Sequence, residues 1–144
     1  MRVREVMHKQ TLRTIKPNET VAFGKELFRR YDVHHLLVMD GRDLVGIVAD
    51  RDLADQREDL PIEKLMISPP ITIPPDEHIR KAAALMSGQV IGSLPVVEDG
   101  KVLGIITTYD LISLIAKGAI HPAPNAERPV LAKRGPRRKP VSPR

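Results

Sequence analysis

Two short segments carry the residues best suited to chemistry, and both contain a short apolar run. The later one, Gly104–Asp110, reads Gly-Ile-Ile-Thr-Thr-Tyr-Asp, and the earlier one, Gly46–Asp52, reads Gly-Ile-Val-Ala-Asp-Arg-Asp. If a strand ends at Ile106 and a helix begins at once, the free N–H groups of its first turn suit an anion such as phosphate. The Thr107 hydroxyl can add a donor, and the Asp110 carboxylate can accept hydrogen bonds from two ribose hydroxyls. The same Thr-x-x-Asp spacing also fits a capping box, which needs no ligand.

The earlier segment lacks the hydroxyl. Ala49 stands where Thr107 stands in the later segment, whereas Asp52 keeps the place of Asp110. Arg51 can bring a positive charge to a phosphate in a central cleft, or it can be a solvated surface arginine. We therefore expect Thr107 and Asp110 to contribute more to ligand binding than Ala49 and Asp52.

Both segments belong to an internal repeat. At a shift of 58 residues the chain aligns without a gap: Ile15–Glu19 with Ile73–Glu77, Leu36–Asp40 with Leu94–Glu98, Leu44–Val48 with Val102–Ile106, and Asp52–Leu53 with Asp110–Leu111. Upstream, Val3–Met7 pairs with Ile62–Met66 at a shift of 59 residues. Two copies are too few for a solenoid, so the repeat predicts two halves related by a pseudo-two-fold axis.

Each repeat predicts the element order β-α-β-β-α. An extended piece (12–15, 71–73) precedes a helix, for which Asn18 and Asp76 are candidate N-caps. Two hairpins follow, 36–39 with 44–48 and 94–97 with 102–106, and second helices begin near Asp50 and Thr108. We predict an α/β (α+β) fold with domains 1–58 and 59–118. A repeat of this size has a small core, so we expect the two sheets to pack together and the chain to form a homodimer.

Composition excludes several classes of site. The chain has 144 residues and no Cys, so it has no disulfide, thiol nucleophile or cysteine zinc site. It has no P-loop motif, and we find no Ser/His/Asp arrangement or paired carboxylates with catalytic spacing. Met1–Thr11 has no apolar run typical of a signal peptide, and no stretch of 18 apolar residues occurs. We expect a cytoplasmic protein that is not an enzyme.

The repeated pattern resembles a tandem pair of CBS domains, a Bateman-type module named after cystathionine β-synthase. The resemblance covers about residues 1–118 and rests on Val3–Met7, Ile62–Met66, Ser93–Gly100, Gly46–Leu53 and Gly104–Leu111. It implies a regulatory module, often dimeric, that binds AMP, ADP, ATP or S-adenosylmethionine and signals to a partner protein. It implies no required cofactor.

The resemblance also implies further contacts with such a ligand. His34 and His35 precede the strand 36–39, where members of the family often carry a residue that reaches phosphate. They can equally be histidines without a ligand, and adjacent residues of a strand point to opposite faces, which disfavours a shared metal. Ile71, Thr72 and Pro95 correspond to the edges of an adenine slot in the second half, or they are ordinary core residues.

The excess positive charge lies at the C-terminal end. Residues 121–144 hold seven basic residues and one acidic residue, together with six of the 13 prolines. This composition predicts a disordered tail over residues 119–144. It is either a solubilising extension or an electrostatic arm, and the second reading gives an alternative function: a dimeric scaffold whose tail binds nucleic acid or an anionic membrane.

Overall fold

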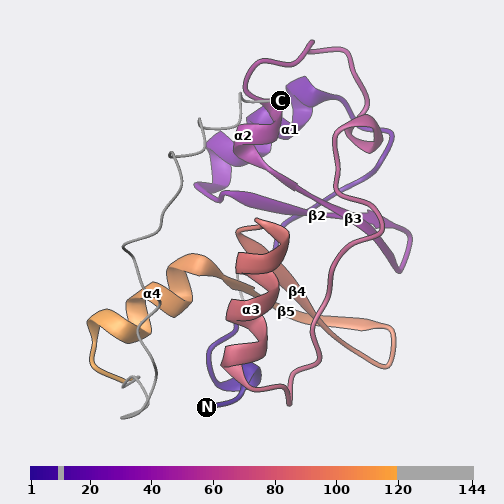
Figure 1. The fold of residues 1–144 in the computed structure, drawn as a ribbon. Coiled ribbons are helices and arrows are strands. Elements are labelled where there is room, and N and C mark those ends of the chain that lie inside the picture. Colours follow the sequence, from indigo (N-terminus) through magenta and orange to yellow (C-terminus); the bar gives the residue numbers. More distant parts are fainter. Residues whose placement is uncertain (10–11, 120–144) are drawn as a thin grey trace.

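Two small sheets with helices against them form the body of the protein (Figure 1). The computed structural model describes residues 1–9 and 12–119, so the tail predicted over residues 119–144 lies, apart from its first residue, outside the described residues. The elements are η1 (Val3–Glu5), β1 (Thr14–Ile15), α1 (Val21–Tyr31), β2 (His35–Asp40), β3 (Asp43–Ala49), α2 (Asp50–Leu53), η2 (Ile62–Lys64), α3 (Ile79–Gln89), β4 (Ser93–Glu98), β5 (Lys101–Thr107) and α4 (Thr108–Ala116). This order confirms the predicted mixed α/β fold.

The two sheets differ in their first strand. In the first repeat β1 runs parallel to β2, and β2 is antiparallel to β3. In the second repeat β4 and β5 form an antiparallel pair, and the predicted strand 71–73 is reduced to an isolated bridge between Ile73 and Val96. Prolines stand on both sides of that segment, at 69–70 and 74–75. Because proline has no N–H to donate to a ladder, the strand cannot extend.

Both long helices begin two residues later than predicted. Thr20 caps α1, its hydroxyl accepting a hydrogen bond from the Phe23 N–H at 3.2 Å, and His78 caps α3, its Nδ1 accepting from the Arg80 N–H at 3.1 Å. The predicted caps Asn18 and Asp76 were wrong, because both residues lie in the turns that precede the helices.

A glycine lets α1 pack closely on its neighbours. A Cβ atom at Gly24 would lie 2.8 Å from Leu53 Cδ1 and 3.1 Å from Ile62 Cδ1. Gly24 lowers the intrinsic helix propensity, but it allows α1 to approach the core at this point.

The short helices η1 and η2 are exchanged between the repeats. Val3 of η1 and Met7, which follows it, pack in the core of the second repeat, whereas Ile62 of η2 packs in the core of the first. Hydrogen bonds hold both segments in place: the Val3 N–H donates to the Glu77 carbonyl at 2.9 Å, and the Ile62 N–H donates to the Glu19 carbonyl at 2.8 Å. Figure 1 shows the indigo N-terminal segment beside one end of α3. The domain boundary near residue 58 stays a prediction, and a cut there would divide both cores.

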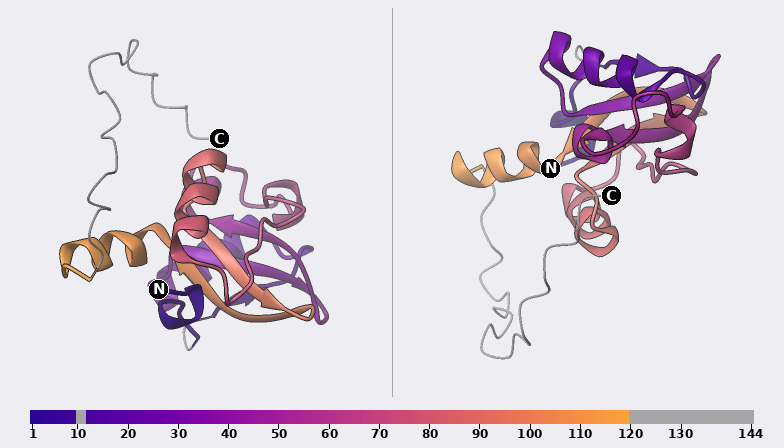
Figure 2. Two further views of the ribbon diagram at one scale, coloured as in Figure 1. Left: turned by 60° about the horizontal axis from the view of Figure 1, so that its bottom comes forward. Right: turned by 90° about the horizontal axis from the view of Figure 1, so that it is seen from above.

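A separate apolar cluster joins the two sheets. It contains Leu37 of β2, Ile47 of β3 and Ile105 of β5, with Val102 packed against them. This contact agrees with the expected packing of sheet on sheet. In both views of Figure 2, α4 extends outward from the end of β5. Among the described residues, no helix has the length and apolar character needed to cross a membrane.

Candidate functional site

An open cleft lies between the two repeats, with a volume of about 880 Å³. Its walls come from the end of the β2–β3 hairpin and α2, from the chain after η2, and from the chain that joins α3 to β4. The lining residues are His35, Ile47, Ala49, Arg51, Asp52, Lys64, Leu65, Met66, Ile67, Ser68, Ile71, Gln89, Val90, Ile91, Gly92 and Ser93. The cleft is therefore built from both repeats.

Asp52 lines this cleft, and one of its two carboxylate oxygens accepts a hydrogen bond from within the described residues. Its Oδ2 accepts a hydrogen bond from the Ala49 N–H at 3.1 Å, at the start of α2. Within residues 1–9 and 12–119 we find no donor to its Oδ1. Arg51 and Lys64 line the same cleft and bring two positive charges to it. The cleft can thus accept hydrogen bonds from hydroxyl groups and attract an anionic group.

The two adjacent histidines have different environments. His35 lines the cleft, and burial there lowers its pKa, so its imidazole is neutral at pH 7. His34 is not among the lining residues; it is largely exposed, and its Nδ1 lies 3.0 Å from Asp50 Oδ2. The hydrogen bond to Asp50 raises the pKa of His34. Of the two predicted histidines, only His35 faces the candidate site.

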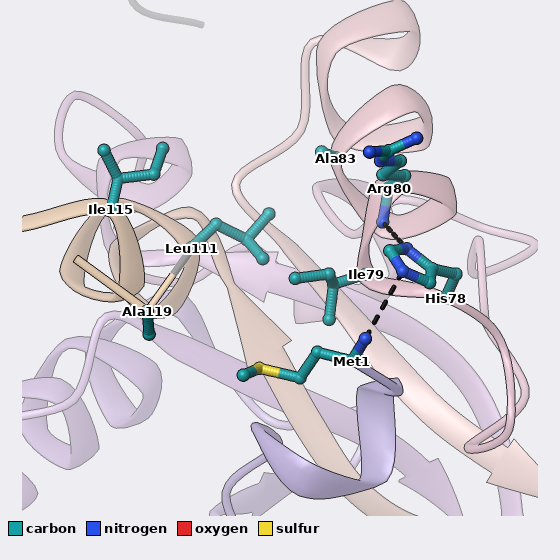
Figure 3. A pocket seen from close by; sticks show the side chains of 8 residues that line it. All are labelled: Met1, His78, Ile79, Arg80, Ala83, Leu111, Ile115 and Ala119. Atoms are coloured by element: carbon teal, nitrogen blue, oxygen red, sulfur yellow. Dashed lines mark hydrogen bonds between the residues drawn. The ribbon is translucent and has the colours of Figure 1, made fainter. Parts of the chain in front are cut away.

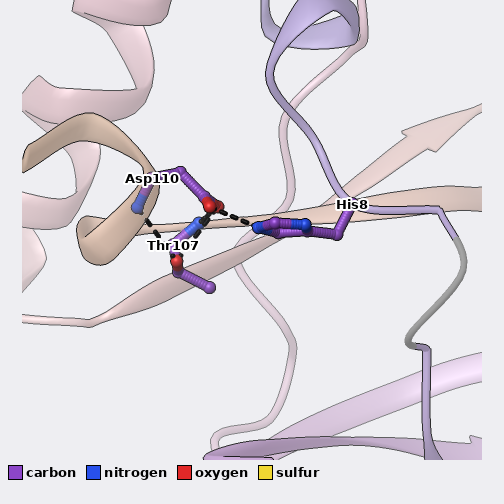
Figure 4. Close-up of polar contacts among 3 residues, drawn as sticks. All are labelled: His8, Thr107 and Asp110. Carbon is purple, nitrogen blue, oxygen red and sulfur yellow. Dashed lines mark hydrogen bonds and ion pairs between the residues drawn. The ribbon is translucent and has the colours of Figure 1, made fainter. Parts of the chain in front are cut away.

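The second predicted segment forms a complete capping box. The Thr107 N–H and hydroxyl both donate to Asp110 Oδ2, at 2.8 Å and 3.0 Å, and the Asp110 N–H donates to the Thr107 hydroxyl at 3.3 Å. The remaining oxygen, Oδ1, contacts Nε2 of His8 (Figure 4). The Asp110 side chain is only 6% exposed. In this structure internal donors occupy both oxygens of Asp110.

His8 is the residue that sequence reasoning missed. It lies 102 residues from Asp110 in the chain, so no local spacing relates them. The alignment of the two repeats shows one difference here: His8 follows Met7, whereas Ile67 follows Met66 at the equivalent position. At this position the second site gains an imidazole where the first has an aliphatic side chain.

Gly46 and Gly104, the first residues of the two predicted segments, allow the chain that follows η2 and η1 to pack closely against β3 and β5. A Cβ atom at Gly46 would lie 2.5 Å from Met66 Sδ and 3.0 Å from the Ile67 carbonyl oxygen. One at Gly104 would lie 2.6 Å from the His8 carbonyl oxygen. Real Cβ atoms almost never lie under 3.0 Å from another atom, so a larger residue at Gly104 would displace the main chain at His8, and one at Gly46 would displace the Met66 side chain.

The three remaining predicted site residues, Ile71, Thr72 and Pro95, lie in different surroundings. Ile71 lines the cleft together with Asp52. Pro95 is buried in β4 opposite Ile105, and Thr72 is exposed; neither is among the lining residues. Of the three residues predicted for the adenine slot, only Ile71 lines this cleft.

A smaller, largely apolar hollow lies between α3, α4 and the N-terminus (Figure 3). Its volume is about 350 Å³, and Met1, Ile79 and Leu111 point into it. The Met1 amino group lies 3.3 Å from Nε2 of His78 at its edge. Across the part of the chain that the structure describes, no group of three or more acidic, His or Cys side chains is placed to hold a metal ion.

Comparison with known proteins agrees with this architecture. The chain is 34% identical over 100 residues to an inosine-5'-monophosphate dehydrogenase of Korarchaeum cryptofilum, which covers 68% of this chain but only 21% of that enzyme. It is 31% identical over 140 residues to a CBS domain-containing protein of Dictyostelium discoideum, covering 85% of this chain and 95% of that one.

A solved structure shares the whole arrangement of the two repeats. The CBS domain pair of protein MJ0100, in complex with 5'-methylthioadenosine and S-adenosyl-L-methionine, superposes with a TM-score of 0.76 at 28% identity. The superposition covers 82% of this chain and 98% of that chain. The family model of the CBS domain matches twice, at residues 3–59 and 62–117. The chain therefore belongs to the CBS domain family, as a tandem pair.

Proposed function

We propose that this chain is a regulatory module that binds an adenosyl ligand in the central cleft and passes a change of shape to a partner protein. The ligand class comprises AMP, ADP, ATP and S-adenosylmethionine. The observation that carries the proposal is the cleft itself, which has a volume of about 880 Å³ and a more apolar than polar lining that includes three charged residues, Arg51, Asp52 and Lys64. Small-molecule sites have this character and size. The related CBS pair solved with two adenosyl compounds supports the ligand class.

Each part of such a ligand has a group to meet in the cleft. The open Oδ1 of Asp52 can accept hydrogen bonds from ribose hydroxyls, and Arg51 and Lys64 can neutralise phosphate. Ile71 and Ile91 offer apolar surface to the adenine ring. Because the lining comes from both repeats, a ligand that binds one arrangement of the repeats more tightly shifts the population toward it.

We propose regulation and not catalysis for the chain. The matched dehydrogenase region is only 21% of that enzyme, so the enzyme's name carries no activity over to this chain. The partner protein that the module signals to can be sought by a pull-down with and without ligand.

A thermal-shift screen with AMP, ADP, ATP and S-adenosylmethionine, with GMP as control, tests the proposal. A ligand at about 100 times its Kd should stabilise the fold by about 2.7 kcal/mol, which raises Tm by about 10 °C for a chain of this length. Ala49→Leu, which places a larger side chain in the cleft next to Asp52 and Arg51, should abolish the shift. Ala54→Leu, the same change on an exposed site outside the lining, should keep it. No shift with any of these ligands would refute the proposal.

We also propose that the chain is a homodimer. The side chains of Tyr109, Ile112 and Ile115 follow one another at three-residue spacing on α4 and are 75%, 62% and 63% exposed. A stripe of large apolar residues in water is unfavourable unless another surface covers it, and a second copy supplies a matching stripe. Sedimentation equilibrium should give twice the 16.1 kDa chain mass, and Ile112→Glu should restore the single-chain mass. A single-chain mass for the unmodified protein at tens of micromolar would refute the dimer.

A further inference from the structure

His8 occupies the carboxylate through which the second repeat would bind a ligand. Its Nε2 donates to Asp110 Oδ1, while Thr107 supplies both donors to Oδ2 (Figure 4). The imidazole itself is half exposed, whereas the Asp110 side chain is 6% exposed. The contact therefore lies at the surface end of an almost buried carboxylate, where an incoming hydroxyl group would have to bind.

The backbone fixes His8 at this place. Its N–H donates to the Ile105 carbonyl at 2.9 Å, and its carbonyl accepts from the Ile105 N–H at 3.0 Å. Gly104, which leaves no room for a Cβ atom, allows this approach. The side chain of residue 8 is thus presented to Asp110 by two hydrogen bonds of the main chain.

The first repeat has the same backbone arrangement with a different side chain. The Ile67 N–H donates to the Ile47 carbonyl at 2.9 Å, and the Ile47 N–H donates to the Ile67 carbonyl at 3.2 Å. Ile67 cannot hydrogen-bond to a carboxylate, and it lines the open cleft beside Asp52. Of the equivalent residues His8 and Ile67, only His8 has a side chain that can hydrogen-bond to the aspartate of its site.

We propose that His8 is a specificity-determining residue, which decides that the first repeat and not the second takes the adenosyl ligand. This inference rests on the proposed function, because it concerns the choice between two sites for the same ligand class. In the second repeat a ribose must displace the imidazole before it reaches Asp110. A site whose competent state is a minor population binds with an affinity reduced by that fraction. For a charge-assisted hydrogen bond the reduction is about tenfold or more.

Exchanging the two residues tests the proposal. Calorimetric titrations with AMP, ADP, ATP and S-adenosylmethionine should give one equivalent bound by the unmodified protein. His8→Ile gives residue 8 the side chain of its counterpart, and a second equivalent should appear. Ile67→His gives the first site the imidazole, and its affinity should fall about tenfold or more. Thermal unfolding of each variant establishes that it is folded, and His8→Ala, which also removes the imidazole from Asp110, replaces His8→Ile if that variant does not fold.

A second measurement needs no ligand. The ring signals of His8 in an NMR spectrum should shift on Asp110→Asn and stay in place on Asp52→Asn, because only Asp110 contacts the imidazole. Unmoved ring signals would overturn the inference, since the contact would be absent in solution. Unchanged stoichiometry in His8→Ile, with normal ligand binding, would overturn it while leaving the proposed function intact. Absence of binding in every variant would instead refute the proposed function, and this inference with it.

Discussion

Replacing Asp52 and Asp110 by alanine, one at a time, should separate ligand binding from stability. The two residues are counterparts in the repeat, yet their surroundings differ. Asp52 accepts one hydrogen bond, from the Ala49 N–H, and faces the cleft. Asp110 accepts from Thr107 twice and contacts His8, and its side chain is almost fully buried. We expect Asp52→Ala to reduce affinity and Asp110→Ala to reduce the free energy of unfolding.

The expected size of each effect follows from the contacts that are lost. A charge-assisted hydrogen bond contributes about 1.5–3 kcal/mol, so Asp52→Ala should raise the Kd of the ligand about 10-fold to 150-fold. Loss of the hydrogen bond from the Ala49 N–H in this variant should lower the free energy of unfolding by about 1 kcal/mol. Asp110→Ala leaves the donors of Thr107 without their acceptor in a nearly buried place, which should cost about 2–3 kcal/mol. That loss lowers Tm by about 10 °C for a chain of this length.

Calorimetric titration and urea denaturation measure the two quantities on the same samples. Asp55→Ala is the matched control, because Asp55 is exposed and is not among the residues that line the cleft. It should change neither Kd nor stability by much. The sequence pattern favoured Asp110 as the ligand residue, so the experiment decides between the two rankings. If folded Asp110→Ala loses ligand while Asp52→Ala keeps it, our reasoning from the cleft is wrong.

Three further predictions concern packing, charge and pH. Gly104→Ala should destabilise the fold by about 1–3 kcal/mol in urea denaturation, because the new Cβ atom would lie 2.6 Å from the His8 carbonyl oxygen. As the control, Gly88→Ala lies in open space on α3 and should stabilise the fold by up to about 1 kcal/mol. Equal effects of the two changes would contradict the packing argument. Arg51→Ala should weaken ATP more than S-adenosylmethionine in calorimetry, since only ATP carries phosphates; equal losses would place Arg51 away from them. Burial lowers the pKa of His35, so the unfolded chain takes up this proton at higher pH than the folded one, and stability falls as pH drops below about 6.5. His35→Asn should lessen that fall between pH 7 and 5, and an unchanged slope would show that His35 does not cause it.

Local patterns in the sequence were sufficient for the hairpin strands and the helices of both repeats, but not for η1, η2 or the loss of the strand at 71–73. Each of the four long strands was predicted within one residue at both ends, because alternating apolar runs and polar turns define a hairpin locally. The repeat itself placed two equivalent segments at the ends of strands β3 and β5. The starts of α2 and α4 were predicted near Asp50 and Thr108, as observed. The starts of α1 and α3 were predicted less well; for α1, Thr20 and Asn18 are both good caps, and the choice depended on where the turn ends.

The assembly of the site could be predicted only in part. His35, Arg51, Asp52 and Ile71 were all named from the sequence, and the structure brings these four together in one cleft. The resemblance implied a place for Ile71 in an adenine slot of the second half, and it did not foresee that Ile71 lines the same cleft as Asp52 of the first. Which residues share a cleft depends on how the two sheets pack.

The sequence by itself determined the two repeats, their strands and the paired Gly-to-Asp segments, since these depend on side-chain periodicity and turn chemistry within a few residues. Tertiary structure alone decided that η1 packs on the second repeat and η2 on the first. That exchange carries His8 to Asp110 and Ile67 to the open cleft. The physical reason is that a segment packs where its apolar side chains and main-chain hydrogen bonds find partners, and these partners lie far away in the chain. Two acidic residues that look equivalent in the sequence thereby acquire different surroundings.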